Sequence, residues 1–161
     1  MRLATLAGVV LLVGCGPGID PLIGSYTFTL SGLDTNTAPN TQTSTPSGGG
    51  TVAITTNATT LTDFVITLAQ SDTTPCVLTG SVAAMKAADP EITIKPTQTC
   101  SFYGSGTTVT ATITSGKAVV KLAATRASDT LTLDVAYSYA YQVFGVNFAG
   151  TGHRTYSGAR R

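Results

Sequence analysis

The chain has 161 residues, with 9 Lys and Arg, 8 Asp and Glu, and a formal net charge of +1. Charged residues make up 11% of it, against about 25% in typical domains, and threonine takes their place. This balance excludes proteins that depend on a clustered excess of Lys and Arg, so we expect no nucleic-acid partner. The length suits one domain with a core large enough to fold alone.

The N-terminal segment has the form of an export signal. Arg2 is followed by an uncharged apolar stretch, residues 3–13, that is too short to cross a bilayer as a helix. The stretch ends in Leu12-Val13-Gly14-Cys15, which resembles the lipobox of bacterial lipoproteins at all four positions. The alternative is an ordinary signal peptide that happens to be followed by a cysteine. Residues 1–14 are therefore predicted to be a removable signal peptide.

The lipobox resemblance implies a specific modification of Cys15. It implies cleavage before this residue, a thioether-linked diacylglycerol on its sulfur, and an acyl chain such as palmitate on its new amino group. Two or three chains suffice for stable anchoring, so the membrane is the first expected partner. Gly16 follows the cysteine instead of an inner-membrane retention Asp, which points to the outer membrane. Residues 15–23 are predicted to be the lipidated cysteine and a short tether.

Alternation with a period of two dominates the first half of the remaining chain. The segments SYTFTL, TVAIT, TDFVITL and EITIK each place their large apolar residues on one face, as half-buried strands do. The apolar set is Tyr26, Phe28, Leu30, Val52, Ile54, Phe64, Ile66, Leu68, Ile92 and Ile94. Between the first two segments lies a low-complexity stretch rich in Thr, Ser, Asn and Gly. We expect a disordered loop there, at about residues 32–50.

The chain has three cysteines, and the lipobox accounts for one of them. An exported chain with two further cysteines, Cys76 and Cys100, most simply joins them in a disulfide. A reversal near Asp89 would bring them opposite each other on neighbouring antiparallel strands. The alternatives are two free thiols or a metal site, but two cysteines without a nearby histidine make a poor zinc set. No metal and no cofactor are expected.

Later segments extend the same alternation. Ser115-Gly116 is predicted to be the two-residue turn of a hairpin, in which Thr114 pairs with Lys117. The next strand places Leu131, Leu133, Val135, Tyr137, Tyr139 and Tyr141 on one side. The final segment is expected to be a strand interrupted by Gly150 and Gly152.

These elements predict an all-β fold, a single antiparallel domain over residues 24–161 with about 8–10 strands. Successive hairpins favour an up-and-down barrel over a two-sheet sandwich. The sequence Gly24-Ser25-Tyr26, with a long loop after the first strand, is similar to the Gly-x-Trp region of lipocalins. The tryptophan of that motif is absent here. The resemblance implies a lipocalin-like barrel.

The residue inventory offers little for catalysis. His153 is the single histidine, and no Gly-x-Ser-x-Gly nucleophile motif is present. With Arg154, Arg160 and Arg161 it forms a basic C-terminal stretch, which we interpret as a solvated last strand and a frayed tail. No catalytic residues are predicted, and the protein is expected not to be an enzyme.

The alternating tyrosines are the candidate binding residues. Tyr137, Tyr139 and Tyr141 would line a pocket for a small apolar ligand if they face a barrel interior, with hydroxyls to orient it. Ordinary core packing is the competing interpretation. The sequence therefore predicts a lipid-anchored, non-enzymatic binding module of the bacterial envelope. The alternative is a structural or adhesion module that contacts an envelope protein and carries no small molecule.

Overall fold

The structure, a computed structural model, describes residues 22–59, 63–70, 74–84, 89–104 and 107–161. Cys15 and the predicted signal peptide lie outside the described residues. Within them, the chain forms the strands β1 (Gly24–Ala38), β2 (Gln42–Ser44), β3 (Gly48–Thr56), β4 (Asp63–Gln70), β5 (Cys76–Ala84), β6 (Glu91–Ile94), β7 (Thr99–Gly104), β8 (Thr107–Lys121), β9 (Thr130–Val143) and β10 (Val146–Arg160). A single 3-10 turn, η1 (Arg126–Ser128), precedes β9. No described helix is long and apolar enough to cross a membrane.

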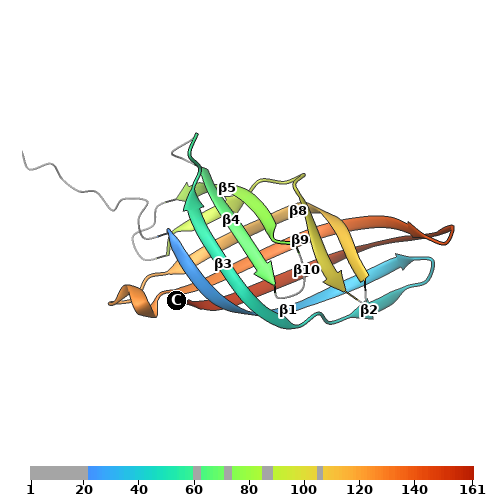
Figure 1. Ribbon diagram of the computed structural model, residues 1–161, viewed down its shortest axis with the longest axis horizontal. Coiled ribbons are helices and arrows are strands. Elements are labelled where there is room, and N and C mark those ends of the chain that lie inside the picture. Colours follow the sequence, from blue (N-terminus) through green and yellow to red (C-terminus); the bar gives the residue numbers. More distant parts are fainter. Residues whose placement is uncertain (1–21, 60–62, 71–73, 85–88, 105–106) are drawn as a thin grey trace, which may run out of the picture.

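Eight of the described strands form the wall of one closed antiparallel barrel (Figure 1). Neighbours in the wall follow chain order from β1 through β3, β4, β5, β6, β8 and β9 to β10, and β10 pairs with β1 to close it. The two extra strands are short: β2 pairs with the second half of β1, and β7 with the first half of β8. The predicted all-β, up-and-down barrel is therefore confirmed, and the two-sheet sandwich is not formed.

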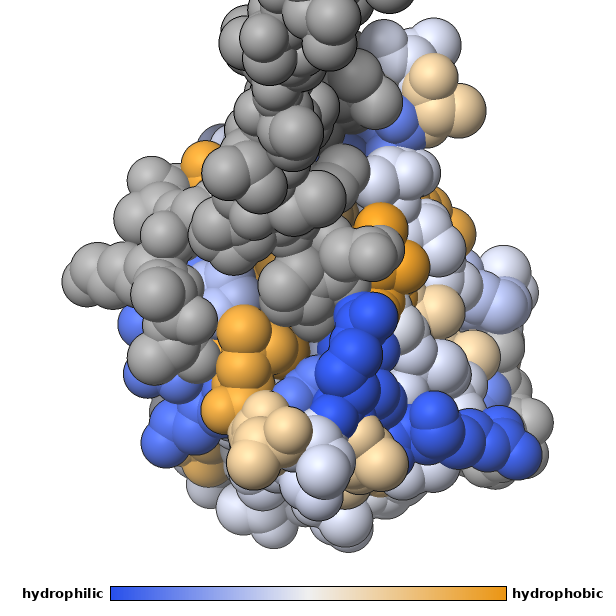
Figure 2. Space-filling model, turned by 90° about the vertical axis from the view of Figure 1, so that its left-hand side faces the viewer, coloured by the Kyte–Doolittle hydropathy of each residue, from blue (hydrophilic) through white to orange (hydrophobic). Residues whose placement is uncertain are grey.

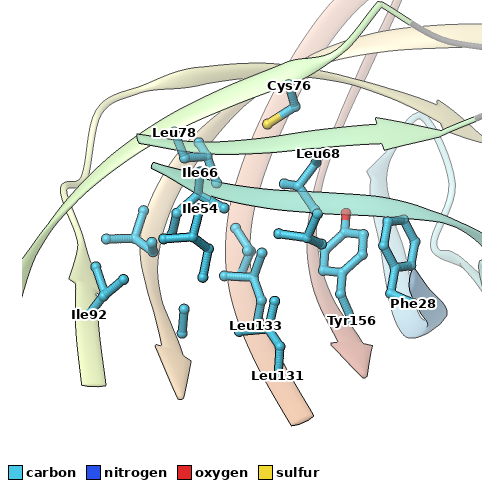
Figure 3. Close-up of a cluster of buried hydrophobic side chains, with 14 of the residues drawn as sticks. Phe28, Ile54, Ile66, Leu68, Cys76, Leu78, Ile92, Leu131, Leu133 and Tyr156 are labelled. Atoms are coloured by element: carbon cyan, nitrogen blue, oxygen red, sulfur yellow. The ribbon is translucent and has the colours of Figure 1, made fainter. Parts of the chain in front are cut away.

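One half of the barrel interior is packed with apolar side chains (Figure 3). All ten apolar residues that the alternation placed on inward faces between Tyr26 and Ile94 are buried, as are Leu131, Leu133 and Val135. Phe28 and Tyr156 meet edge to face, with ring centroids 5.0 Å apart. Alternation identified these positions because every second side chain of a barrel strand points inward.

The predicted hairpin turn at Ser115-Gly116 is wrong, because β8 runs straight through these residues. A bulge against β9 lies between Ile113 and Ser115. The extra residue of the bulge moves the inward-facing positions of β8 from odd to even numbers, so Ile113 before it and Ala118 after it are both buried. A two-residue turn would produce the same change. Gly116 lies so close to the Asp134 carbonyl that an added Cβ would come within 2.8 Å of it. The hydrophobic pattern alone cannot separate the two arrangements.

The predicted loop at about residues 32–50 is also corrected. The first strand continues to Ala38, and residues 42–44 return beside it as β2 before β3 begins at Gly48. The second half of β1 pairs with β10 from Gly32 to Ala38, with one register shift. The apolar alternation ends at Leu30 because the later inward side chains, Asp34 and Asn36, are polar. The strand itself continues to Ala38. Leu22, assigned to the tether, is fully buried in the core.

The disulfide closes a seam in the barrel wall. β5 pairs with β6 only from Gly80 onward, and β7 has no ladder with β5, so residues 76–77 and 99–101 lie beside each other without a ladder between them. Cys76 and Cys100 are bonded across this seam, with their Cα atoms 5.1 Å apart. The predicted disulfide is formed, but the predicted hairpin is not continuous: the returning segment is divided into β6 and β7, and β7 pairs with β8 instead of β5. The Gln98 amide provides a second link, because its oxygen accepts from the Thr79 backbone N–H at 2.6 Å and its nitrogen donates to the Thr79 carbonyl at 2.9 Å.

The barrel end that holds η1 and the C-terminus is closed by a buried ion pair. Arg160 Nε lies 3.0 Å from Asp129 Oδ2, and Arg160 also donates to the Ile23 carbonyl at 2.7 Å and to the Tyr26 hydroxyl at 2.9 Å. Asp129 in turn accepts from the Ala123 backbone N–H at 2.8 Å. Figure 2 views this end and shows strongly hydrophilic side chains beside a few apolar ones. These bonds join the start of β1, the residues before β9 and the end of β10.

Candidate functional site

The opposite half of the barrel has a polar and aromatic interior. There the inward positions of β1 are Asp34 and Asn36, which continue the face of Tyr26, Phe28 and Leu30. The second half of β9 contributes tyrosines, and the middle of β10 contributes Arg154. The strands that wall the apolar half thus extend into a region where side-chain hydrogen bonds replace apolar packing.

Arg154 is the centre of this region and is only 1% exposed. Its Nη2 atom lies 3.1 Å from Asp34 Oδ2, and its Nε atom donates to the Tyr137 hydroxyl at 2.8 Å. The Tyr137 hydroxyl donates to Asp34 Oδ1, which closes a three-residue ring of hydrogen bonds. One step further along β9, the Tyr139 hydroxyl donates to Asn36 Oδ1. A buried guanidinium is tolerated here because a carboxylate and a phenol solvate it.

Aromatic rings surround the guanidinium and continue outward from it. The Arg154 Cζ atom lies 4.5 Å from the centroid of the Phe102 ring and 5.4 Å from that of Tyr137, both within cation–π range. From Tyr137 the rings follow one another along β9 to Tyr139 and Tyr141, with centroids 6.4 and 6.1 Å apart. Tyr141 then stacks on Phe148 of β10 at 5.1 Å. The result is an aromatic row that runs from the buried charge toward the open end.

A cavity of about 50 Å³ lies in this region and opens to solvent. Its lining comes from β1, β2, β7, β8, β9 and β10, and comprises Asp34, Asn36, Ser44, Phe102, Val109, Ala111, Tyr137, Tyr139, Tyr141 and Arg154. The volume is well below the roughly 300–1,000 Å³ of pockets that enclose drug-sized ligands. The cavity therefore has room for a few water molecules or for one small chemical group.

The Tyr137 and Tyr139 hydroxyls are held in their protonated form. Burial raises the pKa of Tyr137 well above its ordinary value, and the hydrogen bond to Asp34 raises it further. Burial also raises the pKa of Tyr139, assisted by the negative charge of Asp34. Deeper in the barrel, burial raises the pKa of Tyr156 to about 12. At neutral pH these phenols keep their protons and do not act as general bases; the Tyr137 hydroxyl donates its hydrogen bond to Asp34, and the Tyr139 hydroxyl donates its hydrogen bond to Asn36.

All three tyrosines predicted from the sequence line this one cavity, Tyr137 as its buried floor and Tyr139 and Tyr141 as half-buried walls. Gly150 and Gly152, expected to interrupt the last strand, lie within the continuous β10 opposite these residues. A Cβ on Gly150 would collide with the Tyr139 ring, and one on Gly152 with the Tyr137 ring. The two glycines thus make room for the tyrosines and do not break the strand.

The charged members of the site were missed. Arg154 was assigned to a solvated strand, which is wrong because its side chain points into the barrel. Asp34 and Asn36 fell in the expected loop. Their spacing in the sequence could have identified them, because residues an even number of positions apart on one strand share a face. Arg154 is two residues from the inward Tyr156, and Asp34 is four residues from the inward Leu30. Arg160 is likewise no part of a frayed tail, because it pairs with Asp129.

His153 is exposed on β10, where neighbouring side chains alternate faces, and so does not share the cavity with Arg154. Among the described residues, no three His, Cys, Asp or Glu side chains gather as a metal site would require. Comparison of the chain with protein-family models and with curated proteins found no match.

Proposed function

We propose that this protein is a non-enzymatic binding module, and that the cavity at Arg154, Asp34 and the three tyrosines binds one ring-sized group of a small ligand. The observation that carries the proposal is a buried, hydrogen-bonded ion pair at the floor of a solvent-accessible cavity. Apolar residues of similar volume are often as stabilising as a buried ion pair or more so, so folding alone gives little reason to keep this one. A binding site gives such a reason, because polar groups fix the orientation of a ligand.

The lining indicates the chemistry of the ligand. Tyr139 and Tyr141 offer ring faces to an apolar or aromatic group, while Asp34, Asn36 and Ser44 offer oxygens to a hydrogen-bond donor. Asp34 and Arg154 neutralise each other, so the site does not favour a strongly charged ligand. A small ligand with an apolar ring and one hydroxyl or amide group suits this lining better than a purely apolar one.

The lipobox at Leu12-Val13-Gly14-Cys15 supports placing this module in the bacterial cell envelope, held by lipid on Cys15 and facing away from the cytoplasm. Gly16 supports the outer membrane as the destination. The disulfide is consistent with an oxidising compartment. In this proposal the membrane anchor determines the location, and the cavity determines the activity.

Native mass spectrometry of the chain with Cys15→Ser, purified from its own envelope fraction, tests the binding proposal. We expect an additional mass that is lost on denaturation and is absent from a Tyr139→Ala variant. His153→Ala serves as the matched control, because this side chain lies on the same pair of strands but faces away from the cavity. That variant should retain the additional mass.

A bare protein mass from the native preparation would contradict the proposal if phenol, tested as a defined probe, also fails to shift the nuclear magnetic resonance signals of the three tyrosines. Retention of the additional mass by Tyr139→Ala would contradict the assignment of this cavity. In either case the alternative gains support: a structural or protein-interaction module that carries no small molecule.

A further inference from the structure

The turn between β9 and β10 carries the most exposed large apolar side chain of the described residues. Phe144 is 102% exposed, and Val143 and Val146 on either side of it are also exposed. We call residues 143–146 the apolar tip. It lies at the end of the long β9–β10 ribbon, far from the C-terminus (Figure 1).

The backbone of the tip gives no reason for a phenylalanine at this position. Val143 pairs with Val146, so Phe144 and Gly145 form a two-residue hairpin loop. Both have positive φ, 48° and 79°. Loops of this kind prefer Asn-Gly or Asp-Gly, because bulky side chains are strained in the left-handed region. Phe144 therefore combines an unfavourable backbone conformation with full exposure of an aromatic ring to water, which points to a contact outside the chain.

The surroundings of the tip favour a lipid bilayer as that contact. No charged residue occurs from residue 135 to residue 152, so the outer part of the ribbon can approach hydrocarbon without burying a charge. Tyr141, which also lines the cavity, and Phe148 stack on each other two positions behind Val143 and Val146, at the depth where aromatic residues favour the membrane–water boundary. The β9–β10 ladder satisfies backbone groups up to the Val143–Val146 pair.

The size of the apolar tip is a further argument. Three apolar side chains on one turn are far too few for a specific protein interface, which buries about 1,000 Å² or more with complementary packing. Insertion into a bilayer needs no complementary surface and works with small apolar areas when a second attachment is present.

We propose that the apolar tip inserts into the membrane surface as a second attachment point of this protein. The insertion is driven by apolar burial, so neutral lipids suffice and salt has little effect. The start of β1 lies at the other end of the barrel. This orientation rests on the proposed lipid anchor at Cys15: with attachments at both ends, the barrel lies along the membrane and does not stand on it. This inference does not depend on the ligand cavity, because none of the tip residues lines that cavity.

Fluorescence gives a direct test, because the chain contains no tryptophan. The full chain is coupled through Cys15 to a maleimide phospholipid in phosphatidylcholine vesicles, which supplies an anchor whatever its natural lipidation. We expect the emission of a Phe144→Trp variant to shift to the blue and to be quenched by brominated lipids. The matched control is Val77→Trp on β5, an exposed site at 52% on a different part of the wall, which should show neither effect. Unchanged Phe144→Trp emission, or equal quenching of both variants, would overturn the proposal.

A second variant separates binding from folding. Phe144→Asn creates the Asn-Gly loop that this backbone prefers, so its Tm should equal or exceed that of the original chain. Its partition onto phosphatidylcholine vesicles, measured by co-sedimentation of chains that carry one fatty-acyl chain coupled to Cys15, should fall by about tenfold. Val77→Thr should change neither quantity. Unreduced partition of Phe144→Asn, or loss of partition in 1 M salt for the original chain, would contradict insertion; the latter would indicate an electrostatic contact.

Discussion

Each half of the barrel contains an arginine–aspartate ion pair, but the two pairs have different surroundings. Arg160 and Arg154 lie six positions apart on β10, and each pairs with an aspartate and contacts a tyrosine ring. At the closed end, Arg160 also donates to the Ile23 carbonyl and so joins three segments of the chain. In the other half, the aspartate and tyrosine that bind Arg154 both line a cavity open to solvent.

The difference shows how an ion pair can be judged by its surroundings. At the closed end the pair satisfies the Ala123 N–H, and it donates at 2.7 Å to the Ile23 carbonyl, which Arg126 Nη2 approaches only to 3.4 Å, so the pair has a structural task. Around Arg154 the bonds that hold the guanidinium come from side chains on strands whose backbones are already paired in ladders. This pair could be replaced without unpairing the backbone, which supports a role in binding.

The largest expected effect concerns the ion pair beside the cavity. Asp34→Leu leaves the Arg154 guanidinium buried without its carboxylate, and should lower the free energy of unfolding by about 3–5 kcal/mol. The double variant Asp34→Leu with Arg154→Leu should recover most of that loss, because no charge remains buried. Urea unfolding followed by circular dichroism measures both quantities. If the double variant loses as much stability as Asp34→Leu and Arg154→Leu lose together, this pair is structural and does not differ from the pair at the closed end.

The matched double replacement at the closed end sharpens the contrast. Asp129→Leu with Arg160→Leu also removes both charges, but leaves the Ala123 N–H and the Ile23 carbonyl without these partners. Each hydrogen bond lost at these partly buried backbone groups costs about 0.5–1.5 kcal/mol, so this double variant should remain destabilised. If both double variants have the same free energy of unfolding, the two ion pairs do not differ in their structural importance.

A smaller effect is expected at the seam in the wall. Cys76→Ala with Cys100→Ala removes a cross-link between residues 24 apart, which in the chain-entropy model costs about 3 kcal/mol. Amide hydrogen exchange should accelerate most in residues 76–77 and 99–101, because they lie beside each other without a ladder. Gln98→Ala, which removes the side-chain link to Thr79 and leaves the hydrogen bond from the Lys95 N–H to the Thr79 carbonyl, should cost about 1 kcal/mol. Uniform acceleration over all strands would contradict a local seam.

The smallest effect concerns alkaline pH. Tyr156 has a pKa near 12 in the folded barrel and an ordinary value of 10 when unfolded. The folded state therefore holds the proton more tightly. The resulting stability is complete below pH 10 and is lost as the pH rises toward 12, by about 1 kcal/mol at pH 11. Tyr156→Phe should show a smaller decline between pH 10 and 11 in urea unfolding, and an unchanged slope would refute the role of this group.

The apolar half of the barrel was predictable from the sequence because alternation is a local property. Tyr26, Phe28 and Leu30 needed only the period of a strand to be assigned to one face. The disulfide followed from counting cysteines in an exported chain. The half that holds Arg154 was not predictable in this way, since an inward Asp34 or Asn36 looks like a loop residue until its partner on another strand is known.

The bulge in β8 was missed for a related reason. The bulge between Ile113 and Ser115 shifts the inward-facing positions by one residue, and a two-residue turn would shift them in the same way. Only the strand that pairs with this segment distinguishes a bulge from a turn. That strand is β9, which pairs with β8 on both sides of the bulge.

The sequence by itself determined that the chain is all-β, that its strands have one apolar face, and that three tyrosines share a side. These features depend on residues one or two positions apart. Only the tertiary structure decided that Arg154 and Asp34, 120 residues apart in the chain, meet beside those tyrosines. The physical reason is that a barrel closes between its first and last strands, and the energy of a buried charge depends on a partner that no local pattern identifies.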